Sequence, residues 1–222
     1  MRVTARTKPA IPQRKDALRN RTALLAAAKA AFAEEGLDAA LEDIARRAGV
    51  AIGTLYRHFP TRMDLVAVVI ADKKRAWIKA AEAAVVMEPA WDGLVFFLER
   101  VCELQAGDLA FNDIASMRFQ HAPGIETARK RAHDLSRRIV ERAQAEGSLR
   151  PDVTAEDVAF IVWAHSRVSE ATHAIDPNAW RRYLALTLDG FRATAAHPLP
   201  APPLRPRQVL RAQLQLGRRR LR

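Results

Sequence analysis

Residues 36–59, GLDAALEDIARRAGVAIGTLYRHF, decide the fold. Small and apolar side chains recur at helical spacing in two short segments, Leu41–Ala48 and Ile52–His58. Only Gly49, Val50 and Ala51 separate these segments, and glycine adopts a left-handed turn conformation at little steric cost. Two short helices with such a link form a helix-turn-helix, whose second helix fits the major groove of DNA.

Helical patterns continue on both sides of this unit. An earlier helix is expected from about Asn20 to Glu35, ended by Gly36, and Thr61 with Asp64 predicts the start of a long helix to about Val86. No segment alternates apolar and polar residues for long enough to form a strand. We therefore predict an all-α protein of about nine helices.

Four regions follow from the composition along the chain. We expect a disordered basic arm over 1–19, a three-helix DNA-binding domain over 20–65 and a helical ligand-binding and dimerisation domain over 66–196. A Pro- and Arg-rich tail over 197–222 is predicted to be a linker with one loosely held helix.

The formal net charge of +11 is concentrated at the two ends of the chain. Residues 1–21 carry +6 and residues 205–222 carry +7, so the segment between them is slightly acidic. Basic extensions can contact a polyanion, or they can merely keep the protein in solution. Because residues 22–62 hold equal numbers of basic and acidic side chains, we expect the arm to supply most of the attraction to DNA, through Arg14, Lys15, Arg19 and Arg21.

Several classes of protein are disfavoured by the sequence. The single Cys102 cannot form an intramolecular disulfide, and neither a secretory signal nor a membrane-spanning segment is visible, so we expect a cytoplasmic protein without contact to membranes. Glu170 and His173 form one E-x-x-H pair, but helical metal sites of that kind need a second copy. With no Gly-rich phosphate loop or nucleophile motif either, we predict no enzymatic activity, no cofactor and no metal.

The segments GLD (36–38), LEDIARRAGV (41–50) and GTLYRHF (53–59), after the helix LLAAAKAAFAEEG (24–36), resemble the signature of the tetracycline-repressor (TetR) family. The strong resemblance covers residues 20 to about 70, and WRRYLALTLDGF (180–191) is similar to the end of the family's C-terminal domain. One departure is that alanines, at 39, 40 and 51, precede the two short helices, where the family usually has Ser or Thr. The resemblance implies a transcriptional regulator of bacterial DNA, found with the nucleoid, and we expect a repressor that a small-molecule effector releases from a palindromic operator.

Side-chain chemistry, together with the resemblance, suggests the DNA contacts. Thr54 and Ile52 can meet base edges, Gly53 allows close approach of the backbone to phosphate, and Arg57 can bind guanine or phosphate. Tyr56, His58 and Arg62 resemble the phosphate contacts of the family. Leu55 and Phe59 are better interpreted as core residues.

A palindromic operator requires a two-fold homodimer. The resemblance assigns its interface to the last two helices, with Ile161, His165, Val168, Tyr183, Thr187 and Phe191 as candidates. The ligand is expected among the middle helices, with Trp77, Phe96, Phe97, Met117, Phe119 and His121 as candidate contacts. The alternative function is non-specific binding of nucleic acid or of an anionic surface through the basic tails.

Overall fold

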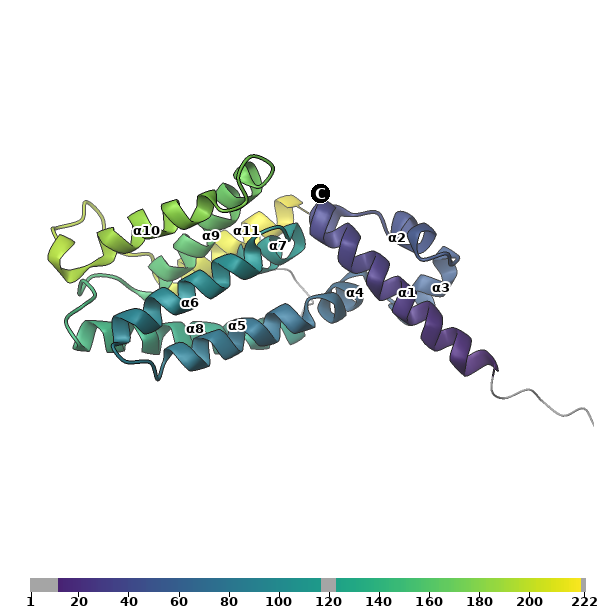
Figure 1. Cartoon of the computed structure of the whole chain (residues 1–222), viewed down its shortest axis with the longest axis horizontal. Coiled ribbons are helices and arrows are strands. Elements are labelled where there is room, and N and C mark those ends of the chain that lie inside the picture. Colours follow the sequence, from purple (N-terminus) through teal and green to yellow (C-terminus); the bar gives the residue numbers. More distant parts are fainter. Residues whose placement is uncertain (1–11, 117–122, 221–222) are drawn as a thin grey trace, which may run out of the picture.

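The structure, a computed structural model, describes residues 12–116 and 123–220, and within them the chain is almost entirely helical (Figure 1). Its elements in chain order are α1 (Pro12–Glu35), η1 (Gly36–Asp38), α2 (Leu41–Arg47), α3 (Ile52–His58), α4 (Arg62–Val69), α5 (Ala71–Ala84), α6 (Ala90–Gln105), α7 (Leu109–Ser116), α8 (Pro123–Ala145), α9 (Ala155–Thr172), α10 (Ala179–Phe191), η2 (Ala193–Ala195) and α11 (Pro206–Arg220). The predicted all-α class is confirmed, with eleven α-helices in the described residues against about nine expected.

Helices α1 to α4 form the end of the molecule that contains the helix-turn-helix (Figure 1). Phe32 of α1, Ile44 of α2, Leu55 of α3 and Leu65 of α4 are completely buried in one shared core. Gly49 has a φ of +69° between α2 and α3, as its place in the turn predicts. Thr61 and Asp64 form the reciprocal capping box expected at the start of α4.

The first helix begins earlier than expected. α1 starts at Pro12, a residue type well suited to the first turn of a helix, so residues 12–19 of the expected disordered arm are helical. Residues 1–11 lie outside the described residues. The basic side chains of Lys15 and Arg19 are therefore presented on a helix, where their spacing is set by its geometry.

The long helix expected from Thr61 to Val86 is interrupted at Ile70, which has a φ of −86° and a ψ of 0° and separates α4 from α5. Leu65, Val66 and Ile70 belong to the core of the helix-turn-helix, whereas Trp77 and Ala81 belong to a second core. The interruption lies where the chain passes from one core to the other. Periodicity could not reveal it, because both segments are helical and each has an apolar side.

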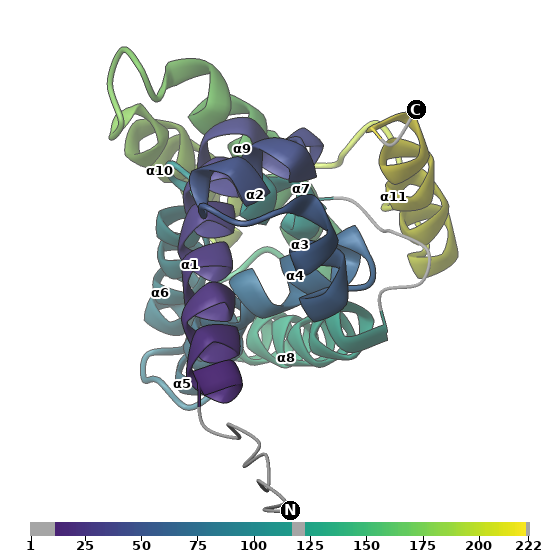
Figure 2. The same ribbon diagram turned by 90° about the vertical axis from the view of Figure 1, so that its right-hand side faces the viewer.

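The second core lies between α5, α6, α8, α9 and α10, with part of α7. The C-terminal α11 packs beside this bundle (Figure 2), with Val209 and Gln213 buried. The helix predicted in the tail is present, and it is docked on the body. Among the helices of the described residues, none has the length and apolar character needed to cross a membrane.

Candidate functional site

The recognition helix α3 has one side buried against its neighbours and one side exposed. Leu55 and Phe59 are buried, as expected of core residues, and they fix the helix against its neighbours. Tyr56, with 46% of its surface exposed, Gly53 and Arg57 lie on the outer side. Ile52, Thr54 and His58 are half-buried beside them. Six of the residues predicted to contact DNA therefore belong to one short helix whose outer side is exposed.

Neither short helix has a side-chain N-cap. Ala40 precedes α2 and Ala51 precedes α3, and the methyl side chain of an alanine cannot accept a hydrogen bond from the N–H groups of the first turn. The position of α2 is instead stabilised by Arg47, whose guanidinium lies 3.1 Å from Glu34 and 2.8 Å from Glu35 at the end of α1. Both pairs are solvent-exposed, so their contribution is small, and buried apolar packing carries most of the stability of the unit.

Arg62 is directed inward. Its Nη1 donates hydrogen bonds to the backbone carbonyls of Leu37, at 2.8 Å, and Ala39. Arg62 thus ties the start of α4 to the link between α1 and α2. Sequence reasoning predicted a phosphate contact here, and the structure adds a bracing contact that the sequence did not suggest.

The candidates on the arm fall into two groups. Lys15 and Arg19 are exposed on α1, and Arg19 lies 3.4 Å from Asp16 in an exposed pair. Arg21 instead stacks on Phe59, with its guanidinium carbon 4.8 Å from the ring centroid, and so joins α1 to the end of α3. The side chain of Arg14 lies outside the described residues.

The candidate dimer surface on α9 and α10 needs a correction. Ile161, 6% exposed, and His165, 0% exposed, are buried inside the single chain and cannot meet a partner in this conformation. His165 packs edge-on against Trp180 at 5.2 Å between ring centroids, and burial lowers its pKa to about 4. Its helix position placed it on an apolar stripe, but that stripe faces the core.

The outward faces of α9 and α10 carry other apolar residues. Leu186 is 60% exposed, and Tyr183 and Thr187 are half-buried on the same helix. Phe160 and Trp163 on α9 are half-buried and pack in a T-shaped pair with centroids 5.2 Å apart. Of the remaining candidates, Val168 and Phe191 are also half-buried, and Phe191 packs against the second core. The sequence analysis missed Leu186, Phe160 and Trp163, although their i, i+3 and i+4 spacing on helices could have revealed them.

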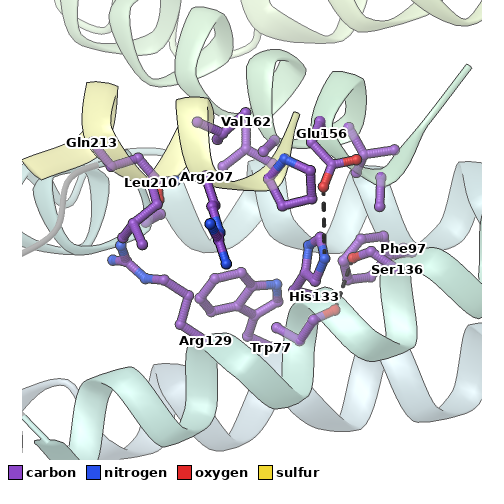
Figure 3. Close-up of a pocket in the computed structure, with 17 residues that line it drawn as sticks. Trp77, Phe97, Arg129, His133, Ser136, Glu156, Val162, Arg207, Leu210 and Gln213 are labelled. Carbon is purple, nitrogen blue, oxygen red and sulfur yellow. Dashed lines mark hydrogen bonds and ion pairs between the residues drawn. The ribbon is translucent and has the colours of Figure 1, made fainter. Parts of the chain in front are cut away.

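A cavity of about 270 Å³ lies in the second bundle (Figure 3). Helices α5, α6, α7, α8, α9 and α11 contribute to its wall, which is formed by Trp77, Phe97, Ala115, Arg129, Ala132, His133, Ser136, Ala155, Glu156, Val158, Ala159, Val162, Pro206, Arg207, Val209, Leu210 and Gln213. Of the predicted ligand contacts, Trp77 and Phe97 lie in this wall. Phe96 does not, because it packs half-buried against the core. Met117, Phe119 and His121 lie outside the described residues.

Polar groups of the cavity lie at two sides. In Figure 3, the guanidinium groups of Arg129 and Arg207 are on the side nearer Gln213, whereas His133 and Glu156 face each other on the side nearer Ser136. The His133 Nε2 to Glu156 Oε1 distance is 3.8 Å. The indole Nε1 of Trp77 is buried and has no hydrogen-bond partner among the described residues. Sequence reasoning missed the contribution of α8, although Arg129, Ala132, His133 and Ser136 share one helical face.

Helix α7 connects the cavity to the helix-turn-helix. Ala110 and Ile114 are buried in the core of α1 to α4, whereas Phe111 and Ala115 are buried in the second core. The carboxylate of Asp113 accepts a hydrogen bond from the backbone N–H of Leu37 at 3.4 Å. One two-turn helix therefore has one face in each core, and Ala115 also lines the cavity.

Cys102 and Glu170 are the remaining residues whose possible chemistry the sequence analysis considered. Burial raises the pKa of the Cys102 thiol, so this side chain is a poor nucleophile at neutral pH. Glu170 lies 2.6 Å from Arg167 in an exposed pair. Over 12–116 and 123–220, no group of three or more His, Cys, Asp or Glu side chains is arranged to hold a metal ion.

Comparison with known proteins agrees with this geometry. The family model described as bacterial regulatory proteins of the tetR family matches residues 24–69, and the C-terminal domain of SbtR-like transcriptional regulators matches residues 88–193. No curated protein sequence matches the chain. A TetR transcriptional regulator from Streptomyces coelicolor has 30% sequence identity and a TM-score of 0.52, with 79% of this chain and 99% of that chain covered.

Two more distant solved structures share the fold. A ketosteroid transcriptional regulator of Mycobacterium tuberculosis has 22% identity and a TM-score of 0.57, covering 78% of this chain and 94% of that chain. FadR from Bacillus subtilis, solved in complex with stearoyl-CoA, has 17% identity and a TM-score of 0.58, covering 80% of this chain and all of that chain. Members of the TetR family bind operator DNA, dimerise and bind small-molecule effectors, and the family consists of transcription regulators rather than enzymes. The present chain belongs to the TetR family and is a DNA-binding transcription regulator.

Proposed function

We propose that this chain is a homodimeric repressor that leaves a palindromic operator when a small molecule occupies the cavity between α5 and α11. The observation that carries the proposal is the position of α7. This helix has buried side chains in both cores, and its Ala115 lines the cavity.

Recognition of the operator is assigned to the outer side of α3. Tyr56, Arg57 and Gly53 are exposed there, and Thr54 and Ile52 flank the start of the helix. Lys15 and Arg19 on α1 add positive charge that attracts duplex DNA of any sequence. Two copies of α3, held by a dimer contact through α9 and α10, would meet successive major grooves on one face of the duplex.

In this proposal α7, which has side chains in both cores, couples ligand binding to release of the operator. A ligand that displaces Ala115 or Arg129 from its ligand-free position also displaces α7, and with it Ile114 in the core of the helix-turn-helix. The Asp113 to Leu37 hydrogen bond transmits the same movement to η1. In a dimer, a small rotation of each DNA-binding domain changes the spacing of the two α3 helices, so both can no longer contact the operator together.

Selection of bound fragments from the parent genome by the purified protein tests the first part of the proposal. We expect a palindromic consensus sequence, bound at least about 1,000-fold more tightly than random duplex. A reporter gene behind that sequence is expected to be repressed in cells and derepressed by an effector that also weakens binding in vitro. Equal affinity for the selected and random duplexes would instead support non-specific binding through the basic tails.

Binding to chromosomal sites would place the protein with the bacterial nucleoid. Fluorescence microscopy of a tagged protein tests this, because a DNA-bound regulator follows the chromosome whereas the Tyr56→Phe, Arg57→Ala double variant should spread through the cell.

A further inference from the structure

The C-terminal helix α11 forms part of the cavity wall, although it lies beyond the family match that ends at residue 193. We propose that α11 is a functional wall of the effector site, and that Arg207 on α11 together with Arg129 selects ligands that join an apolar body to a negatively charged group. The proposal rests on the proposed function, in which this cavity is the effector site.

The contact of α11 with the cavity is made by one face of an amphipathic helix. Val209 and Gln213 are buried, and Pro206 and Leu210 lie beside them in the wall. Gln208, Arg211 and Gln215 are exposed and do not line the cavity. This division is expected of a helix that docks through a defined surface, and not of a solubilising tail.

The segment before α11 is fastened at its beginning. Arg150, which is buried, donates a hydrogen bond through Nη2 to the carbonyl of His197 at 2.8 Å, and its Nε lies 2.6 Å from Asp152. Residues 198–206 contain five prolines and no regular helix before α11 starts at Pro206. A proline-rich segment is semi-rigid, so it limits the positions that α11 can reach once His197 is held.

The charges of the wall favour an anion. Arg129, which is buried, and Arg207, which is exposed, both contribute guanidinium groups on one side of the cavity (Figure 3), while the carboxylate of Glu156 faces His133 on the other side. The rest of the wall is mainly apolar, including Trp77, Phe97 and Val162. A guanidinium group binds carboxylate, sulfonate or phosphate oxygens in a bidentate manner, and it does so most strongly beside apolar surface that excludes water. A ligand with an aromatic or aliphatic body and one anionic group matches this arrangement.

Two fluorescent probes of similar shape and different charge test the proposal. The anionic probe is 1-anilinonaphthalene-8-sulfonate, and the neutral probe is N-phenyl-1-naphthylamine, which lacks the sulfonate. We expect the full-length protein to bind the anionic probe more tightly than the neutral one. Arg207→Ala should weaken binding of the anionic probe by about 5-fold or more and leave the neutral probe unchanged. Arg211→Ala removes an exposed guanidinium from the same helix that does not line the cavity, and it should change neither affinity.

A second pair of variants tests whether α11 is a wall. Val209→Asp places a carboxylate at a buried contact of α11 and should weaken both probes, because the wall is displaced. Gln208→Asp introduces the same side chain at the exposed neighbouring position, where a carboxylate can still accept the hydrogen bond that Gln208 Oε1 accepts from the backbone N–H of Arg205 at 2.8 Å, and it should leave both probes unchanged. Equal affinities of the native protein for the two probes, an equal effect of Arg207→Ala on both, or equal behaviour of Val209→Asp and Gln208→Asp would overturn the proposal.

Operator binding, measured without any probe, separates this proposal from the proposed function. We expect all four variants to bind the selected operator as the native protein does. If no operator is found while the probes behave as expected, the repressor function fails and the role of α11 stands. If operator binding and repression are normal while the probes contradict the expectation, the role of α11 fails and the repressor function stands.

Discussion

Arg129, which lines the cavity, donates a hydrogen bond to the backbone carbonyl of Ile114, whose side chain is buried in the core of the helix-turn-helix. Trp77, also in the wall, packs edge-on against Phe111 on the same helix α7, with ring centroids 6.1 Å apart. Two residues of the cavity thus contact α7 directly. We therefore expect the proposed coupling between ligand and DNA to run through α7.

Substitution of Arg129 is expected to separate sensing from DNA binding. Arg129→Met removes the hydrogen bond to Ile114 and keeps an unbranched side chain in the wall. Operator affinity without effector should stay within about threefold of the native value. Effector-induced derepression of a reporter should largely disappear even at effector concentrations that saturate the variant, so that weaker binding after loss of the guanidinium from the cavity wall is not the cause. The matched control is Arg131→Met, on the same helix α8 as Arg129. It removes an exposed ion-pair partner of Glu82 on α5 and should respond normally to the effector. A normal effector response in Arg129→Met would exclude this route of coupling.

Two neighbouring substitutions on α3 should have different signatures. Tyr56→Phe removes only a hydroxyl and should weaken operator and random DNA alike by about 1–2 kcal/mol, the size of one hydrogen bond to a charged group. Arg57→Ala should weaken operator binding by about 1–3 kcal/mol and relax the base preference at one position of each half-site. Titrations with operators carrying single base changes measure both effects. A uniform loss for Arg57→Ala would make Arg57 a phosphate contact.

The exposed cations of α1 should act through salt-dependent attraction. Replacing Lys15 and Arg19 with alanine should flatten the slope of log affinity against log salt concentration by about 4 units for the dimer, because each of the four lost phosphate contacts contributes about 0.9. Lys29→Ala changes an exposed charge further along the same helix and serves as the control. The folding of these variants should be unaffected, since both side chains are exposed. An unchanged slope would show that the start of α1 does not contact phosphate.

Leu186 is expected to be central to the dimer contact. Its side chain is 60% exposed in the single chain, and burying a leucine contributes about 1.5–3 kcal/mol. Leu186→Asp occurs twice in a two-fold interface, so it should shift the protein toward monomers at micromolar concentration in analytical ultracentrifugation. Val86→Asp alters another exposed apolar residue, two positions after the end of α5, and should leave the dimer intact. A dimer that survives Leu186→Asp would place the interface elsewhere.

His165 should make stability depend on pH. Burial lowers its pKa from 6.5 to about 4, so the unfolded chain binds this proton more readily than the folded chain. The stabilisation is therefore complete above pH 6.5, and the free energy of unfolding falls by up to about 1.4 kcal/mol per pH unit as the pH decreases toward 4. His165→Leu removes this contribution, and urea unfolding of both proteins across that range measures the difference. Parallel pH profiles for the two proteins would show that His165 is accessible to protons in the native state.

The local sequence was sufficient to predict the helix-turn-helix. The length of α3, the left-handed turn at Gly49 and the capping box of Thr61 with Asp64 were all predicted, because each depends on residues within a few positions of one another. The burial of Leu55 and Phe59 followed from the same local pattern.

The surroundings of the cavity could be predicted only in part. Trp77 and Phe97 were expected there because large apolar side chains on the middle helices had to face an interior. Arg129, Glu156 and Arg207 were not, since a charged residue on a helix is usually solvated, and only the packing of α8, α9 and α11 brings these three to one cavity.

By itself the sequence determined the bounds of α2 and α3 and the start of α4 to within about one residue, since caps, turns and periodicity are short-range properties of the backbone. Tertiary structure decided which core each apolar face joins. It buried His165 inside the chain and left Leu186 exposed. It also interrupted the long helix expected after Thr61 at Ile70, between the two cores, and placed α11 against the bundle. An apolar stripe is satisfied equally by its own core, by a partner subunit or by a ligand, and only the arrangement of all helices in space selects among them.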